Sequence, residues 1–299
     1  MRYFIALLCI TLAGCGGTPK RDDYTKHVNR IDHEQFSQKK FHFSFGENKM
    51  VELRGIADKD DTASNSSILY QGGAGFVGMF AQIGVHALMV DSARDDKLAE
   101  AQSAANFLVS PLIARTENVT LSSLLTRFNE SDSTAEKGSK AVMLKPIFFS
   151  NAAMNQLSLK LIAVVPDEKS EKSRKAKPLY QNLIQVYDRV LTDDEKTQLL
   201  SAETDELNQV LSGMLESAIY VIQQDLSGRY AKPKASAKTF LVPRSGKSKV
   251  VRGKVVEEAC GYKVVRDLRS WYVLFKTPPE ESKTKQNYSL FCQVASEPA

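Results

Sequence analysis

The sequence predicts an α+β fold in which an antiparallel or mixed sheet is packed by two long helices and followed by a small, disulfide-stapled, β-rich C-terminal module. Apolar runs of strand length are separated by polar turns over residues 142–191. Two further segments, residues 91–110 and 192–228, carry apolar residues at the spacing of a buried helix face. Beyond residue 232, short runs rich in β-branched and aromatic residues alternate with glycine and include two cysteines.

The first organised segment of the main body alternates between apolar and polar residues. Phe41, Phe43 and Phe45 are separated by polar residues, and an extended pattern resumes over residues 50–56. This pattern predicts a hairpin or two short strands. His42 would lie on the opposite face from the three phenylalanines, so we expect it to face solvent.

Residues 72–90 contain no formal charge and have small residues at helical spacing. Small residues on one helix face let another backbone approach closely, as in helix pairs within membranes. The segment therefore predicts a tightly packed helix under the sheet, and the alternative is a helix that inserts into or contacts the membrane or mediates self-association. The small residues are Ala74, Gly75, Gly78, Ala81 and Gly84.

Charged residues begin at Asp91 and are followed by alanines and leucines up to Pro111, which predicts an amphipathic helix that ends near the proline. After a polar stretch, the apolar runs at residues 142–149 and 157–165 predict an antiparallel pair, and residues 179–191 a third strand.

The second long helix is predicted to begin at Thr192, because Thr192 and Glu195 have the spacing of a capping box. Apolar residues at three-and-four spacing continue to Ile222, and Gly228 provides a stop. We expect one face of the sheet to receive both long helices.

The C-terminal region contains Cys260 and Cys292, the latter on a last predicted strand over residues 288–294. In a protein exported to an oxidising compartment, as the N-terminus described below indicates, an even pair predicts a disulfide. A closed loop of roughly 30 residues would stabilise the fold by about 3 to 4 kcal/mol in the chain-entropy model. We expect the region to form a small all-β module or a β extension packed on the main domain. Trp271 and Tyr272 offer an exposed anchor for a partner or, alternatively, fill the core.

The N-terminus has the form of an export signal. Arg2 precedes an apolar run over residues 3–13 that is shorter than the roughly 20 residues needed to span a bilayer. The run ends in the four residues Leu12-Ala13-Gly14-Cys15. They resemble the lipobox of bacterial lipoproteins, and the alternative is an ordinary secretory signal that contains a cysteine.

The lipobox resemblance implies that residues 1–14 are removed as a signal peptide and that Cys15 becomes an acylated N-terminus. Several acyl chains would hold the protein on a membrane. The mature chain would begin with a polar tether over residues 15–40. Glycines rather than aspartate follow the cysteine, which in enteric-type bacteria implies the outer membrane. Of its two faces we expect the periplasmic one, with exposure on the cell surface as the alternative.

Charge and motif content limit the classes of function. The formal charge is +5 and includes Arg2, so removal of residues 1–14 would leave about +4, without a basic stripe interleaved with aromatics. We therefore expect no nucleic-acid partner. The four histidines lack metal-ligand spacing, and the chain has no nucleophile elbow or phosphate-binding fingerprint, so we predict no metal, cofactor or catalytic residue.

The order of predicted elements over residues 41–230 resembles the periplasmic α/β domains of envelope lipoproteins, including activators of penicillin-binding proteins and curli-type secretion lipoproteins. This resemblance implies a fold, not a function. We divide the mature body into an α+β domain over residues 41–231 and a C-terminal module over residues 232–299.

The leading functional hypothesis is a non-catalytic, membrane-anchored lipoprotein that binds another envelope protein or assists assembly. Two alternatives remain: a structural lipoprotein that self-associates or contacts the membrane through residues 72–90, and an enzyme on cell-wall or lipid substrates.

Overall fold

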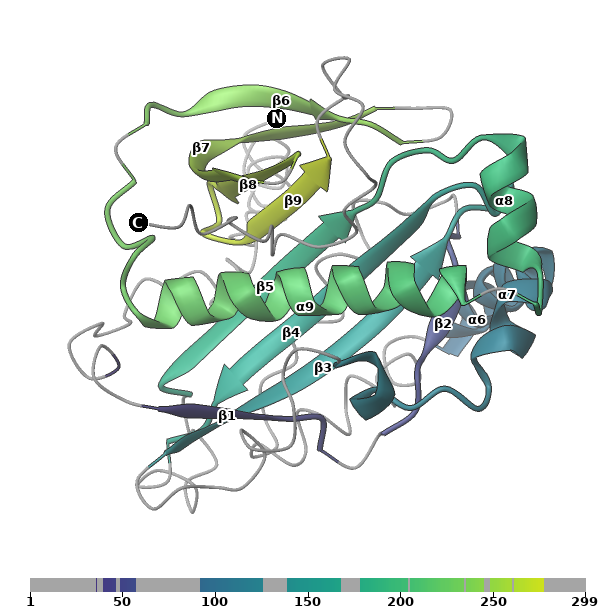
Figure 1. Cartoon of the computed structure of the whole chain (residues 1–299), viewed down its shortest axis with the longest axis horizontal. Coiled ribbons are helices and arrows are strands. Elements are labelled where there is room, and N and C mark those ends of the chain that lie inside the picture. Colours follow the sequence, from purple (N-terminus) through teal and green to yellow (C-terminus); the bar gives the residue numbers. More distant parts are fainter. Residues whose placement is uncertain are drawn as a thin grey trace, which may run out of the picture.

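The computed structural model places one mixed β-sheet at the centre of the protein, with helices on one face and at one end (Figure 1). It describes residues 36, 40–46, 49–57, 92–125, 139–167, 178–203, 205–233, 235–244, 248–259 and 261–276. Residues 1–35, 72–90, 260 and 277–299 lie outside these ranges. The predictions for Cys15, Gly75, Gly78, Ala81, Gly84, Cys260 and Cys292 therefore fall outside the described residues.

Within the described residues, the sheet has nine strands in the order β1-β3-β4-β5-β9-β8-β7-β6, and β2 pairs with β3 beside β1. Strands β1 and β2 run parallel to β3, β9 runs parallel to β5, and the other neighbours are antiparallel. The predicted mixed sheet with packed helices is confirmed. The strands are β1 (Phe41–Ser44), β2 (Leu53–Gly55), β3 (Lys140–Ser150), β4 (Leu157–Val165), β5 (Tyr180–Tyr187), β6 (Lys238–Val242), β7 (Lys249–Ala259), β8 (Tyr262–Asp267) and β9 (Tyr272–Lys276).

The two short N-terminal strands pair with β3 and not with each other. β1 ends opposite Met143, and β2 begins opposite Phe148. Phe148 donates its backbone N–H to Glu52 on that side at 2.9 Å, so Pro146, two residues earlier, faces the same side between the two strands. Proline has no N–H to donate, and the gap between β1 and β2 is a position in β3 that does not require one.

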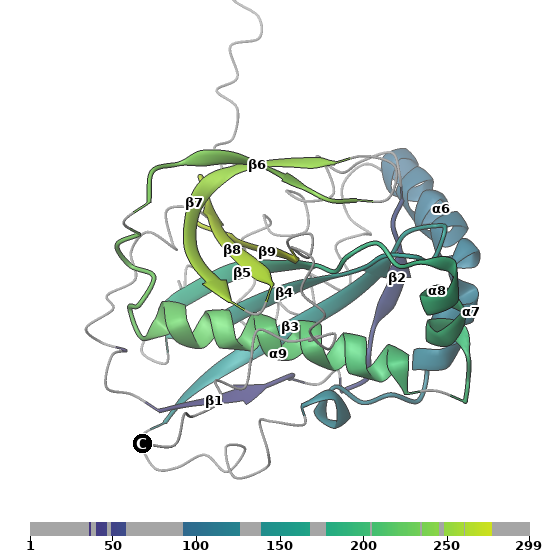
Figure 2. The ribbon, with the colours of Figure 1, turned by 45° about the horizontal axis from the view of Figure 1, so that its top comes forward.

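Four α-helices are described, α6 (Ser92–Leu108), α7 (Ser110–Thr116), α8 (Asp193–Leu200) and α9 (Glu206–Leu226), together with a 3-10 helix at Ser122–Leu124. α9 lies across β4 and β5, whereas α6 packs against β2 at the end of the sheet (Figures 1 and 2). The expectation that one face receives both long helices is therefore wrong for α6.

The predicted single helix from Thr192 to Gly228 is also wrong, because the chain forms α8 and α9 with a break between them. Ser201 has extended backbone angles, and α9 restarts after Asp205. The intervening residues carry no large apolar side chain, so nothing continues the buried stripe from Leu199 to Leu207.

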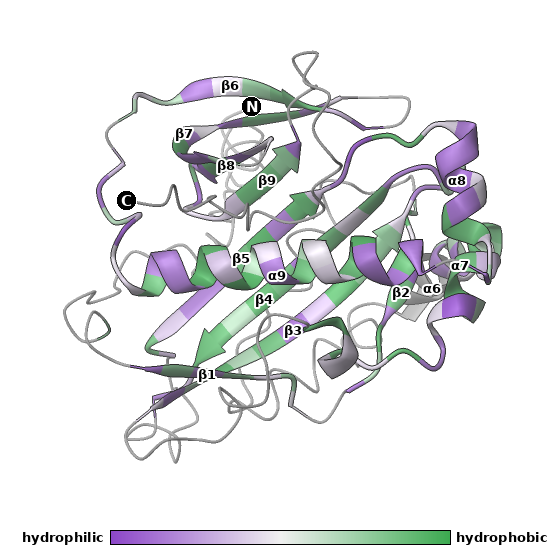
Figure 3. Ribbon diagram, in the orientation of Figure 1, coloured by the Kyte–Doolittle hydropathy of each residue, from purple (hydrophilic) through white to green (hydrophobic). Residues whose placement is uncertain are grey.

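The main core lies between α9 and the sheet, where apolar residues line the strands beneath the helix (Figure 3). A smaller apolar cluster lies where the C-terminal strands curl. Its members come from β5 to β9 and are Tyr187, Val242, Val251, Val265, Val273 and Phe275.

β7 bends along its length, so that β6 and β7 arch over β8 and β9 (Figure 2). The pairing of β7 with β8 shifts by one residue between Val255 and Glu257, which marks a bulge. A Cβ at Gly253 would lie 2.3 Å from the backbone oxygen of Arg266, so this close approach requires glycine.

The four C-terminal strands continue the main sheet, because β9 pairs directly with β5. Trp271 and Tyr272 are both buried, with 2% and 0% of their surfaces exposed. The hypothesis that they form an exposed anchor is wrong, and the core-packing alternative is confirmed. Their burial follows from the β5–β9 pairing, which places this segment in the middle of the sheet.

Candidate binding surfaces of the sheet

The edge of the sheet at β2 is closed by side chains of α6. Gly55 donates its backbone N–H to Asn106 Oδ1 at 2.9 Å, and Gln102 Nε2 donates to the Gly55 carbonyl oxygen at 2.9 Å. Gln102 also donates to Asn106 Oδ1 at 2.8 Å. The two amides thus satisfy both backbone groups of an edge residue, which would otherwise offer a template for another strand.

The approach of α6 to β2 depends on glycine at position 55. A Cβ built there would lie 2.0 Å from the backbone oxygen of Ala105, a distance that no side-chain rearrangement relieves. The helix and strand are therefore in backbone contact.

The edge at β6, in contrast, has no helix or strand packed along it among the described elements. β6 is the last strand in the sheet order, and over the described residues it pairs only with β7. Leu241 is 65% exposed and lies opposite Val250, which is 64% exposed. An exposed apolar pair on an unpaired edge is an arrangement that a protein partner can cover.

Basic residues follow this apolar pair along β7. Arg252 and Lys254 alternate with buried residues along β7 and are exposed, as is Lys238 at the start of β6. None of these three side chains forms an ion pair over the described part of the chain, and residues 238–242 and 249–255 contain no carboxylate. Lys238 pairs with Gly253, so its side chain lies on the opposite face of the ribbon from Leu241. We call Thr239, Leu241, Val250, Arg252 and Lys254 the β6–β7 outer surface.

A second group of cations lies on the inner side of the same two strands. Lys249 reaches from β7 to β5, where its Nζ donates to Gln185 Oε1 at 2.9 Å and to the Tyr187 hydroxyl at 2.8 Å. Tyr187 in turn donates to Gln185 Oε1 at 3.0 Å. Lys160 on β4 lies opposite Gln185 in the strand register, and its Nζ is 5.0 Å from the centre of the Phe149 ring.

The two lysines share an electrostatic environment. The pKa of Lys160 and of Lys249 is lowered to about 8, chiefly by burial, and the positive charge of Lys160 contributes to the lowering at Lys249. Arg244 and Arg269 act on Lys249 in the same direction, and Asp267 opposes them. We call Lys160, Gln185, Tyr187 and Lys249 the inner lysine cluster.

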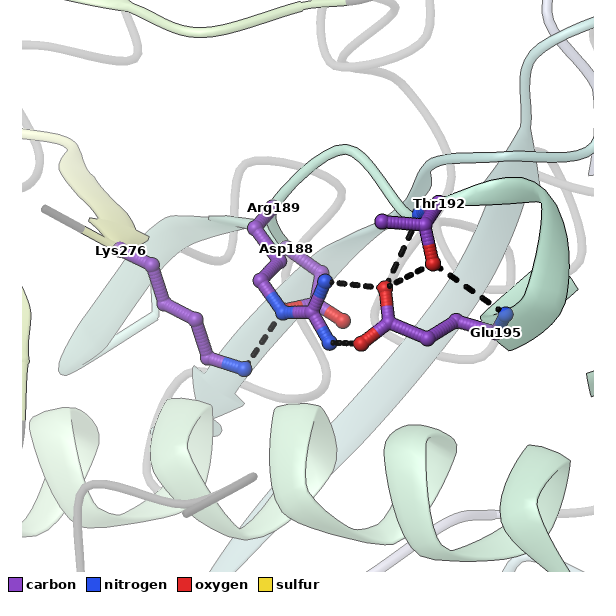
Figure 4. A network of polar contacts seen from close by, with 5 residues as sticks. All are labelled: Asp188, Arg189, Thr192, Glu195 and Lys276. Carbon is purple, nitrogen blue, oxygen red and sulfur yellow. Dashed lines mark hydrogen bonds and ion pairs between the residues drawn. The ribbon is translucent and has the colours of Figure 1, made fainter. Parts of the chain in front are cut away.

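A polar junction connects the ends of three strands, and Figure 4 shows part of it. Asp188, which follows β5 and is 4% exposed, pairs with Lys276 Nζ at 2.8 Å at the end of β9. Gln156 Nε2 donates to the carbonyl oxygens of Asp188 at 2.7 Å and Pro243 at 2.9 Å. These contacts hold the ends of β5, β6 and β9 together.

The same connection contains the predicted capping box, which is confirmed. Thr192 Oγ accepts the Glu195 backbone N–H, and the Glu195 carboxylate accepts the Thr192 backbone N–H at 2.9 Å. Arg189 donates to Glu195 Oε2 at 2.6 Å, and this hydrogen bond lowers the pKa of Glu195 to about 2 (Figure 4). The network starts α8, and each member has a structural partner.

A buried carboxylate joins the C-terminal half of α9 to the sheet by hydrogen bonds. Asp225 accepts hydrogen bonds from the hydroxyls of Tyr180 at 2.9 Å and Tyr272 at 2.6 Å, and from Asn182 Nδ2 at 3.1 Å. Burial raises the pKa of Tyr272. These bonds join α9 to β5 and β9, so the carboxylate is satisfied within the fold.

Glu257 makes a similar connection from β7. It accepts hydrogen bonds from the hydroxyls of Tyr220, at 2.9 Å, and Tyr230, and it pairs with Arg229 at 3.4 Å. Burial raises the pKa of Tyr230, and the bond to the carboxylate raises it further. This network ties the bulge of β7 to the end of α9.

Comparison of the chain with protein-family models, curated proteins and solved structures finds no match. Over the described helices, no apolar stretch reaches the length of a membrane span. The described His, Cys, Asp and Glu side chains form no group of three suited to a metal ion.

Sequence reasoning missed both the outer surface and the inner lysine cluster. The alternation of Val250, Arg252 and Lys254 with buried residues signals a half-exposed strand. The single charge of Lys160 in an otherwise apolar run signals a polar position inside the sheet. The contact of Lys249 with Gln185 depends on tertiary structure and has no local signal.

Proposed function

We propose that this protein is a membrane-anchored bacterial envelope lipoprotein that binds another envelope protein without catalysis, and that the β6 edge receives an extended segment of that partner. The observation that carries the proposal is the exposed β6 strand, with Leu241 and Val250 side by side on its outer face. A partner strand added to such an edge gains main-chain hydrogen bonds, and exposed side chains beside it give specificity.

The charges on the outer surface indicate the chemistry of the partner segment. Arg252 and Lys254 provide two cations on the same face as the apolar pair. A segment that alternates apolar with acidic residues complements this surface, because opposite charges on facing strands stabilise pairing and like charges oppose it.

The membrane attachment is proposed through Cys15, as the lipobox resemblance implies. Acylation there would hold the body on the outer membrane, on its periplasmic face, through a tether of residues 15–40. Mass spectrometry of the purified N-terminus should show an acylated cysteine, and Cys15→Ser should release the protein from membranes. An unmodified N-terminus, or a Cys15→Ser protein that stays with membranes, would reject the anchor.

We further propose a disulfide between Cys260 and Cys292. Cys260 directly follows β7, so the bond would attach the C-terminal segment beside the strands that form the outer surface. Alkylation with and without prior reduction distinguishes the two states by mass. Two alkylated cysteines without reduction would contradict the disulfide.

The binding proposal is tested by crosslinking and pull-down from intact cells. Leu241→Lys adds a charge at the apolar pair and should remove the heterologous protein recovered with the wild-type chain. Leu268→Lys is the matched control, because Leu268 is 69% exposed but lies in the turn after β8. Recovery of only a second copy, or equal recovery with Leu241→Lys, would reject the proposed partner site.

A further inference from the structure

The turn between β8 and β9 shows in which direction the backbone groups of β8 point. The Asp267 N–H donates to the Trp271 carbonyl oxygen at 2.8 Å, and the Asp267 carbonyl oxygen accepts the Ser270 N–H at 3.0 Å. Both backbone groups of Asp267 therefore point toward β9. Because these groups alternate in direction along a strand, those of Arg266 point toward β7. Arg266 lies opposite Lys254, so these two residues form a hydrogen-bonded pair.

The same alternation continues across β7 to β6. The backbone groups of Lys254 point toward β8, so those of Gly253 point toward β6, where Lys238 lies opposite. Every second residue of β6 then points in the same direction. β6 is therefore bonded to β7 through the backbone of Lys238, Phe240 and Val242.

The residue after β6 gives an independent check of this assignment. Val242 lies opposite Lys249 in the last pair of the two strands. If this pair were not hydrogen-bonded, the bonds beside it would need the N–H of residue 243. That residue is Pro243, which has no N–H, and its carbonyl oxygen accepts Gln156 Nε2 at 2.9 Å. The outward-facing backbone groups of β6 therefore end at Leu241.

Thr239 and Leu241 are the two residues of β6 whose N–H and carbonyl groups point away from β7. Over the described part of the chain, these groups have no hydrogen-bond partner. The two residues are about 7 Å apart along the strand, which is the spacing at which an added strand forms successive bonded pairs. One extended segment can therefore satisfy the backbone groups of both residues.

The outer face beside these groups differs between its two ends. Leu241 and Val250 form the apolar end, which lies toward the C-terminus of β6. Arg252 lies opposite Thr239, and Lys254 lies two residues further along β7. Neighbouring strands are about 5 Å apart, so an added strand lies about 10 Å from β7. Across the short Thr239 side chain, a long carboxylate side chain on that strand can meet Arg252.

We propose that the partner segment adds to β6 as an antiparallel strand, bonded through the backbone of Thr239 and Leu241. It carries an apolar residue opposite Leu241 and an acidic residue opposite Thr239, two positions later in its own sequence. A second acidic residue, two positions later again, lies on the side of Lys254. Antiparallel pairing is the more stable per residue, and the opposite charges fix the register. This inference rests on the proposed binding at the β6 edge and adds a direction and a register to it.

Hydrogen exchange of the full chain in detergent, followed by NMR, tests the register without a substitution. The amides of Thr239 and Leu241 should exchange at least about 10-fold faster than those of Phe240 and Val242, because only the latter are bonded to β7. Faster exchange at Phe240 and Val242, or equal rates along β6, would overturn the register.

A pair of peptides tests the direction. The probe is the blocked peptide Thr-Leu-Thr-Glu-Thr-Glu-Thr, and the control has the same residues in reverse order. In NMR titrations the probe should bind at least about 5-fold more tightly than the control, because only the probe places its acidic residues beside Arg252 and Lys254 when it is antiparallel. The probe should also slow exchange of the Thr239 and Leu241 amides. Equal or reversed affinities, or no binding of either peptide, would overturn the direction.

Two pairs of variants separate the side-chain and backbone contributions. Arg252→Gln should remove the preference for the probe, whereas Lys238→Gln, on the opposite face of the ribbon, should keep it. Thr239→Pro should abolish peptide binding without lowering the melting temperature, because an outward N–H is not used by the fold. Phe240→Pro should lower the melting temperature, since it removes a bond to β7. Retained peptide binding by Thr239→Pro would contradict backbone pairing at this residue.

The outcomes distinguish this inference from the proposed partner site. If partner recovery from intact cells depends on Leu241 but the two peptides do not differ, the partner site stands and the direction fails. If Leu241→Lys leaves partner recovery unchanged, the partner site is rejected, whatever the exchange pattern of β6.

Discussion

The β2 edge and the β6 edge of the same sheet differ in how their outward-facing backbone groups are covered. At β2, Gln102 and Asn106 of α6 satisfy the N–H and carbonyl groups of Gly55. At β6, the outer side has no described strand beside it, and Leu241 is exposed. Among the described strands, the β6 edge lacks such a cover, which is why we propose strand addition there.

The β2 edge also restricts more residue types than the β6 edge does. It requires a glycine on β2 and two amides one helical turn apart on α6, so that one face of the helix matches one residue of the strand. The open edge requires only that alternate residues of β6 and β7 stay exposed. Substitutions at the two edges should therefore differ in kind, with loss of stability at β2 and loss of binding at β6.

The largest effect is expected from Gly55→Ala. The new Cβ would meet the backbone oxygen of Ala105, so α6 must move away from β2 and the edge opens. We expect the free energy of unfolding to fall by about 2–3 kcal/mol in urea denaturation. Ser103→Ala, at an exposed position of α6, is the control and should change stability little. A Gly55→Ala protein as stable as the control would show that helix and strand are not in backbone contact.

Asn106→Leu should have the next largest effect. It removes the acceptor of the Gly55 N–H and of one Gln102 donor without shortening the side chain. The unsatisfied groups should cost about 1–2 kcal/mol. Hydrogen exchange followed by NMR should show a faster Gly55 amide in the variant, and unchanged exchange would contradict the proposed closure.

Beneath the open edge, the inner lysine cluster predicts a rise of stability with pH. The pKa of Lys160 and of Lys249 is about 8 in the folded protein and near 10.5 when unperturbed. Between these values the unfolded chain binds more protons, so the free energy of unfolding rises with pH by about 1–2 kcal/mol per lysine. The raised pKa of Tyr187 acts in the opposite direction above pH 10, so the window is pH 8 to 10.

Denaturation across this window measures the effect. Lys249→Met should remove about half of the rise, because one of the two titrating groups is lost. A rise of full size in the variant would contradict the assignment to these lysines.

The smallest effect on stability is expected from Leu241→Lys. The side chain is exposed and contributes little to the core, so the free energy of unfolding should change by less than about 0.5 kcal/mol. Partner recovery should nevertheless be lost. A large loss of stability in urea would show that Leu241 belongs to the fold and not to a binding surface.

Local patterns predicted the parts of the fold that depend on neighbouring residues. The alternation around Leu159 and Leu161 indicated β4, and the spacing of Thr192 and Glu195 indicated the start of α8. The break between α8 and α9 was missed, because a polar stretch on a helix resembles its solvent face until the next buried residue is placed.

Long-range relations could not be predicted in the same way. The pairing of β9 with β5 joins segments more than 80 residues apart, and the position of α6 depends on Gly55 meeting Ala105. The inner lysine cluster likewise needs β7 to arch over the sheet before Lys249 can reach Gln185. These arrangements follow from tertiary packing, for which a single sequence has no periodic signal.

Site-specific photo-crosslinking in intact cells tests the central claim most directly. A photoreactive residue replaces Thr239 on the outer surface of β6 in one protein and Ser103 on α6 in another, both exposed positions. The β6 position should capture a heterologous envelope protein through a segment rich in acidic residues, and the α6 position should not. Equal adducts at both positions, or only copies of the same chain at Thr239, would contradict an open edge that receives a partner strand.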